Sequence, residues 1–151
     1  MPVTKTTSKK LPQQKSEARI KYTDKSVGQP ELTPIFEAIK KLLVPYEKGT
    51  MKLVSSGGQV ILISKKPVEV FGRKEDELWF ASVLVQKGYV GFYYMPVSGD
   101  LKVKELIKPE LLKCLKGKAC FHIKKDDKEM FSQIKDALKV GYDLWHERGW
   151  L

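Results

Sequence analysis

Apolar residues between positions 35 and 43 recur at the spacing of a helix rather than that of a strand. Thr33 is placed to cap this helix, Pro34 suits its first position, and Pro45 ends it because the residue before a proline avoids helical angles. The pattern predicts an amphipathic helix that covers a sheet. Its apolar face repeats at intervals of three and four residues: Ile35, Phe36, Ile39, Leu42 and Leu43.

A second, longer helix is predicted near the end of the sequence. Asp126 is placed to cap it, and Glu129 three residues later completes a capping-box pattern. Gly149 follows a cation-rich end and serves as the stop, after which Trp150 and Leu151 are expected to fold back onto the core. One side of this helix is apolar: Phe131, Ile134, Leu138, Tyr142 and Trp145.

Between the two helices, β-branched and aromatic residues predict several strands. The strongest signals are Leu78–Gln86 and Tyr89–Met95, which are joined by the two-residue link Lys87-Gly88 of a hairpin. Both are apolar at nearly every position, which indicates cover on both faces. The charged segment Arg73–Glu77 is predicted to be a loop. Further strands are predicted at Met51–Val54, Gln59–Ser64, Pro67–Phe71 and Ala119–Lys124.

Two short segments follow the hairpin. Val103–Ile107 fits either a short strand or a helical turn, and Pro109–Lys116 is predicted to be a short helix that Gly117 ends. In the last strand, alternate side chains share a face. Phe121 therefore points to one side of the sheet, and Cys120 and His122 point to the other.

This order of elements predicts an α+β fold. We expect a two-layer α/β sandwich, with one mainly antiparallel sheet of about five or six strands and with the N- and C-terminal helices on one face. Residues 29–151 are expected to form a single domain. Residues 1–28 are expected to be a disordered basic tail, because they hold seven basic and two acidic residues and little that could be buried.

The composition narrows the classes of function. Half of the net charge of +10 lies in residues 1–28, so weak nucleic-acid association is expected only through that tail. No apolar run approaches the roughly 20 residues that span a bilayer, so no membrane partner is expected. The first residues lack the apolar centre of a secretory signal, and the chain has only two cysteines, which together favour a cytoplasmic location and reduced thiols.

The candidate chemistry is sparse, and we predict neither enzymatic activity nor a cofactor. The sequence has no P-loop, no G-x-G-x-x-G and no G-x-S-x-G motif. Cys114, Cys120, His122 and His146 include no C-x-x-C pair, so no metal site is predicted. A thiol nucleophile needs a base beside it, and Cys120 and His122 could form such a pair only if their face of the strand opens into a pocket.

Aromatic residues on strands that are expected to be neighbours suggest a binding surface. A sheet with helices on one face leaves apolar residues on its other face. These residues could line a pocket for a small molecule, contact a protein partner, form a homodimer interface or be covered as core. The leading hypothesis is a non-enzymatic module that binds a small ligand or a partner through Trp79, Phe92, Tyr94, Cys120 and His122.

Two stretches resemble a known family. KPELLKCLKGKACFHIKK (108–125), followed by a helix and RGWL (148–151), is similar to the YdhG-like family of small bacterial proteins of unknown function. The hairpin WFASVLVQKGYVGFYYMPV (79–97) resembles the same family, so the likeness covers roughly residues 31–151. It implies an α/β sandwich akin to frataxin and, as an alternative function, iron binding and delivery. Frataxin-type iron handling uses an acidic surface, whereas Lys124 and Lys125 here precede the last helix.

Overall fold

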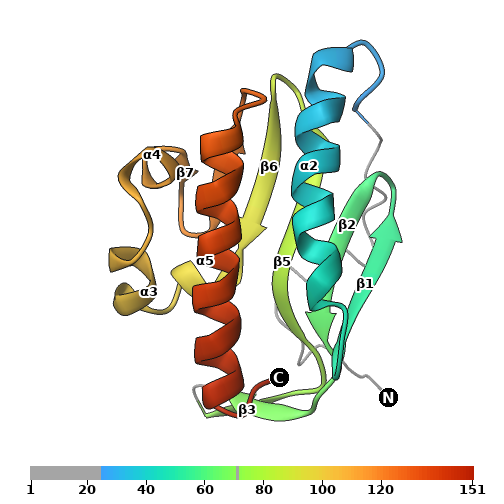
Figure 1. Ribbon diagram of the computed structural model, residues 1–151. Coiled ribbons are helices and arrows are strands. Elements are labelled where there is room, and N and C mark those ends of the chain that lie inside the picture. Colours follow the sequence, from blue (N-terminus) through green and yellow to red (C-terminus); the bar gives the residue numbers. More distant parts are fainter. Residues whose placement is uncertain (1–24, 71) are drawn as a thin grey trace.

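The computed structural model describes residues 25–70 and 72–151 (Figure 1). Its helices are α2 (Thr33–Leu43), α3 (Leu101–Glu105), α4 (Pro109–Leu112) and α5 (Lys128–Glu147). Its strands are β1 (Met51–Ser56), β2 (Gln59–Ser64), β3 (Val68–Val70), β4 (Arg73–Glu75), β5 (Leu78–Gln86), β6 (Tyr89–Tyr94), β7 (Leu115–Lys116) and β8 (Cys120–Ile123). Short 3₁₀ turns lie at Pro30–Leu32, Val44–Tyr46 and Met95–Val97.

Six strands form one sheet in the order β1-β2-β5-β6-β8-β7, and every neighbouring pair is antiparallel. The strands β3 and β4 form a separate two-stranded hairpin beyond the end of β2. Figure 1 shows α2 and α5 lying side by side across one face of the sheet. The predicted α+β class and the mainly antiparallel six-stranded sheet are therefore confirmed.

The core between the sheet and the helices is aromatic at its centre. The Phe80 ring lies 5.3 Å from Trp145 of α5 and 5.8 Å from Tyr94 of β6, both in edge-on geometry. Edge-on aromatic pairs stabilise a core beyond the area that they bury. The Tyr94 hydroxyl donates a hydrogen bond to the Ala137 carbonyl oxygen, which joins the sheet to the middle of α5. This hydrogen bond fixes β6 against α5.

The start of α2 differs from the expectation. Thr33 is the first residue of the helix rather than its cap, since its φ and ψ of −59° and −45° are already helical. A residue that caps a helix through its side chain typically has extended backbone angles. The chain turns earlier, in the 3₁₀ segment Pro30–Leu32, and the Thr33 N–H donates to the Pro30 carbonyl oxygen. At the other end, α2 ends at Leu43, close to the expected place, and continues into the 3₁₀ turn that contains Pro45. The expected reason was wrong, because Val44, the residue before the proline, keeps helical angles (φ −54°, ψ −43°).

The cap of α5 is Asp127, so the prediction of Asp126 was wrong by one residue. Asp127 has extended angles (φ −126°, ψ 115°), and its Oδ1 accepts a hydrogen bond from the Glu129 N–H at 2.9 Å. Because Glu129 lies two residues after this cap, the capping box predicted from a spacing of three does not form.

Replacing Asp127 with alanine is expected to lower the free energy of unfolding by about 1 kcal/mol, because an N-terminal N–H of α5 loses its acceptor. Asp126→Ala is the matched control, and its effect should stay within about 0.5 kcal/mol. Urea denaturation of both variants measures the difference. Equal losses, or a larger loss for Asp126→Ala, would contradict this assignment of the cap.

Two segments in the middle of the chain take a different form from the one predicted. Arg73–Glu75 is a strand that pairs with β3, and only Asp76 and Glu77 remain of the predicted loop. The predicted helix Pro109–Lys116 ends at Leu112, and β7 then pairs with β8. Gly117, with φ of 81°, turns that hairpin instead of ending a helix. The ambiguous segment Val103–Ile107 falls in and just after helix α3.

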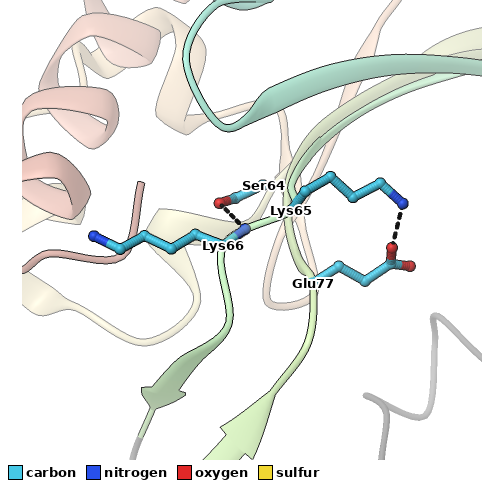
Figure 2. Close-up of polar contacts among 4 residues, drawn as sticks. All are labelled: Ser64, Lys65, Lys66 and Glu77. Carbon is cyan, nitrogen blue, oxygen red and sulfur yellow. Dashed lines mark hydrogen bonds and ion pairs between the residues drawn. The ribbon is translucent and has the colours of Figure 1, made fainter.

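The end of the chain folds back onto the sheet, as expected. Gly149 has φ of 80°, and the Trp150 ring packs 5.4 Å from Trp145. Ser64, at the end of β2, donates its hydroxyl to the Trp150 carbonyl oxygen at 3.1 Å and accepts from the Lys66 N–H at 3.3 Å. Figure 2 shows this second bond, with the Lys65 side chain directed away from Lys66 to its ion pair with Glu77. Ser64 thus links Trp150 to the sheet.

Most of the predicted basic tail, residues 1–24, lies outside the described residues. Nucleic-acid association through this tail therefore stays a prediction. The last residue of the predicted strand Pro67–Phe71 lies outside the described residues as well. Residues 25–28 form a turn beside the β5–β6 hairpin, where Lys25 Nζ donates to Gln86 Oε1 at 3.1 Å. Among the helices of the described residues, none has the length and apolar content that crossing a membrane requires.

Candidate functional site

The five predicted ligand-binding residues do not share one face of the sheet. Phe92 and Tyr94 point toward the helices and are 0% exposed. Cys120 and His122 alternate with Phe121, which pairs with Phe92, so they point to the opposite side. Trp79 lies on that opposite side too, in a small cluster with other apolar side chains. Phe92 and Tyr94 therefore belong to the core and are not available to a ligand.

A β-bulge explains the position of Trp79. Ala81 pairs with Leu62 while Trp79 pairs with Ile63, so Phe80 is an extra residue in β5. Phe80 and Ala81 consequently both face the helices. The residues of β5 before the bulge, Leu78 and Trp79, therefore lie on the faces opposite to those that simple alternation from Ala81 would give them. By simple alternation Trp79 would have shared the face of Phe92 and Tyr94, but the bulge places it on the other side.

The sheet face away from the helices is not an open aromatic surface at its centre. Ile61, Ile63 and Trp79 are each at most 8% exposed, and Leu84 is 4% exposed. Accessible side chains of this face lie along β1, where Val54 is 39% exposed, and along β6 and β8. There the Tyr89 ring stacks on the His122 imidazole, with centroids 3.7 Å apart and planes 9° apart. An extended apolar docking face is therefore absent from the described part of the chain.

The Cys120–His122 pair lacks the properties of a nucleophilic site. Burial raises the pKa of the Cys120 thiol above its ordinary value, although a hydrogen bond with Tyr93 acts in the other direction. Reactive cysteines have lowered pKa values instead. Across the described ranges 25–70 and 72–151, no three His, Cys, Asp or Glu side chains gather where they could hold a metal ion. Iron delivery stays a prediction of the family resemblance.

Replacing Lys116 with glutamine is expected to raise the pKa of His122 toward 6.5, as an NMR titration of the imidazole protons can show. Partial burial lowers this pKa, and the charges of Lys116 and Lys124 lower it further. In the unmodified protein the lowered pKa means that His122 binds fewer protons in the folded state than in the unfolded chain. This contribution should reduce stability as the pH falls through 6.5 toward the folded pKa. A pKa at or above 6.5 in the unmodified protein would contradict this account.

A cavity of about 470 Å³ lies where the β3–β4 hairpin, the start of β5 and the end of α5 meet. All three tryptophans of the chain line it. Trp79 comes from β5, Trp145 from the last turns of α5, and Trp150 from the segment that Ser64 holds against the sheet. The other lining residues in the described part of the chain are Val70, Arg73, Glu75, Leu78, Met95, Pro96, Ser98, Gly99, Asp100 and Arg148.

One side of this tryptophan cavity carries a buried carboxylate. The Glu75 side chain is 3% exposed, and its Oε2 accepts from Arg73 Nη2 at 3.1 Å, while Arg73 itself is 59% exposed. Within the part of the chain that the structure describes, Glu75 Oε1 accepts no hydrogen bond. Buried carboxylate oxygens without a partner are costly. Glu75 therefore offers an unused acceptor to the cavity.

The other charged pair of the cavity is saturated. Arg148 donates to Asp100 Oδ2, and Asp100 Oδ1 accepts from the Lys102 N–H at 2.9 Å. Slight burial acts to raise the pKa of Asp100, but these hydrogen bonds outweigh it and hold the pKa below its usual range. The Arg148 guanidinium also lies over the Trp150 ring, 4.9 Å from its centroid. This pair fixes the wall of the cavity, and each carboxylate oxygen of Asp100 already accepts a hydrogen bond.

The sequence pattern had indicated Trp79 as a ligand-binding residue, had placed Trp145 on the apolar side of the last helix, and had predicted that Trp150 folds back onto the core. It missed Glu75, which stood in a segment predicted to be a charged loop. It also missed the Asp100–Arg148 pair, whose members are 48 residues apart. The available signal was the basic Arg73 two residues before the acidic Glu75, since the first and third side chains of a strand segment share one face.

The chain matches no protein-family model, no curated protein and no solved structure in the comparisons made. The resemblance to the YdhG-like family accordingly remains a prediction, and the site must be interpreted from its own chemistry.

Proposed function

We propose that this protein is a non-enzymatic binding domain that holds a small organic molecule between its tryptophans. The observation that carries the proposal is the gathering of all three tryptophans of the chain around one cavity of about 470 Å³. Ligand sites commonly have such volumes and combine apolar walls with a few polar groups. The proposal keeps the predicted ligand-binding role and moves its place from the sheet face to this cavity.

The chemistry of the wall supports binding rather than catalysis. Neither cysteine and neither histidine lines the cavity. Asp100 is a poor general base, because its pKa is lowered and both of its oxygens accept hydrogen bonds. The alternatives of a protein partner or a homodimer depended on an open aromatic sheet face, and the centre of that face is buried.

Titration with a panel of small aromatic fragments tests the proposal. Tryptophan emission should change in a saturable way, because each tryptophan lies at the cavity. Trp79→Leu should weaken binding at least about tenfold, since aromatic contacts of about 1.5 kcal/mol are lost. Tyr89→Leu is the matched control at the Tyr89–His122 stack and should bind like the unmodified protein. Absence of saturable binding for every fragment, or a loss in the Tyr89 variant alone, would refute the proposal.

A further inference from the structure

We infer that the ligand of the tryptophan cavity carries a protonated amine on an apolar or aromatic body. This inference rests on the proposed function and specifies its ligand class. It follows from three properties of the cavity: an unused buried carboxylate oxygen, the absence of an unpaired cation among the described residues of the wall, and aromatic surfaces around both.

Glu75 provides the recognition group. Its side chain is 97% removed from solvent, yet Oε1 has no hydrogen-bond donor among the described residues. The one cation that it contacts, Arg73, is mostly in solvent, where its charge is screened. An ammonium group in the cavity would donate to Oε1 in a charge-assisted hydrogen bond, and such bonds are about twice as strong as neutral ones. The ligand would thus supply the hydrogen-bond donor that Oε1 of the buried Glu75 carboxylate lacks.

The arginines do not favour an anionic ligand. Arg148 donates to Asp100 and lies over the Trp150 ring, so its charge is already compensated. Arg73 donates to Glu75. An anion entering the cavity would therefore meet the Glu75 carboxylate, and the described lining residues provide no unpaired cation to offset the repulsion. The charge of the wall discriminates between ligands of opposite sign.

The tryptophans suit the rest of such a ligand. Aromatic faces attract organic cations, most strongly when the ring is tryptophan. Trp145 and Trp150 meet at an interplanar angle of 70°, so their ring planes face different directions. Leu78, Met95 and Pro96 add an apolar wall for the uncharged body. A primary or secondary arylalkylamine combines these requirements.

Three probes of similar shape and different charge test the inference: 2-phenylethylamine, 2-phenylethanol and 3-phenylpropanoate. Isothermal titration calorimetry is carried out on the full chain, on Glu75→Gln, and on Glu69→Gln. Glu69 is an exposed carboxylate on the adjacent strand β3 and provides the matched control. Thermal unfolding of each variant shows that it is folded before it is titrated.

The amine should bind the unmodified protein and Glu69→Gln at least tenfold more tightly than the alcohol, and the propanoate should bind most weakly. In Glu75→Gln the preference for the amine over the alcohol should disappear. If the alcohol or the propanoate bound the unmodified protein as tightly as the amine, the inference would be overturned while the binding function stood. If Glu75→Gln kept the tenfold preference, Glu75 would not be the recognition group. If none of the three probes bound, the proposed function itself would fail.

Discussion

Replacing Gly141 with alanine is expected to destabilise the protein by about 1–3 kcal/mol, the usual range for an overpacked core. In an ordinary helix the same change would stabilise by about 1 kcal/mol. Here a Cβ at position 141 would lie 2.8 Å from Pro96 Cγ and 2.9 Å from Tyr94 Cζ, and closer still to the Tyr94 hydroxyl oxygen. The sign of the effect therefore reports the close approach of α5 to β6.

A double-mutant cycle with Tyr94→Phe isolates the clash. Tyr94→Phe alone should cost about 1 kcal/mol, because the hydrogen bond to the Ala137 carbonyl is lost. The hydroxyl is also the group that a Cβ at position 141 would strike first. The combined variant should consequently lose less stability than the two single losses added together. Chemical denaturation measures all three. A stabilised Gly141→Ala variant, or strict additivity, would contradict this packing.

Replacing Phe92 with alanine should cost about 3–5 kcal/mol, as expected for a fully buried phenylalanine. Phe92 is 0% exposed and packs 5.7 Å from the Tyr94 ring and 5.8 Å from the Phe121 ring, beneath the helices. Tyr89→Ala, on the same strand but on the opposite face, should cost only about 1 kcal/mol, the value of its stacking contact with His122.

Denaturant titration of both variants decides which face of β6 is the core. If the losses were equal, or if the Tyr89 variant lost more, the assignment of Phe92 to the core would be wrong. The comparison also bears on the predicted binding face. A large loss of stability at Phe92 would mark that side chain as structural, as its burial indicates.

The sequence was sufficient to predict the elements with long, clear periodicity. The spacing of apolar residues predicted three elements that the structure contains: the helix Thr33–Leu43, the hairpin of β5 and β6, and the final helix. Errors arose where a single residue decides the local structure. Asp126 and Asp127 are chemically identical cap candidates, and only the backbone angles of the folded chain distinguish them.

The candidate site was predictable only in part, for a reason that lies in β5. Alternation alone assigns each side chain of a strand to a face, but the bulge at Phe80 moves Trp79 to the other face. Nothing in the residues LWFASVLVQ indicates where such a bulge falls. The cavity also depends on the β3–β4 hairpin and on the return of Trp150 to Ser64, which are contacts between distant parts of the chain.

Ligand binding in the tryptophan cavity is tested most directly by the ¹H–¹⁵N NMR spectrum of the three indole N–H groups during titration with 2-phenylethylamine. Trp79, Trp145 and Trp150 are the only tryptophans in the sequence, and all three line the cavity. The three signals should shift together with one saturable dependence on ligand concentration, while the backbone signals of Tyr89 and His122 stay in place. Indole signals that do not move, or shifts confined to Tyr89 and His122, would show that the ligand does not bind in this cavity.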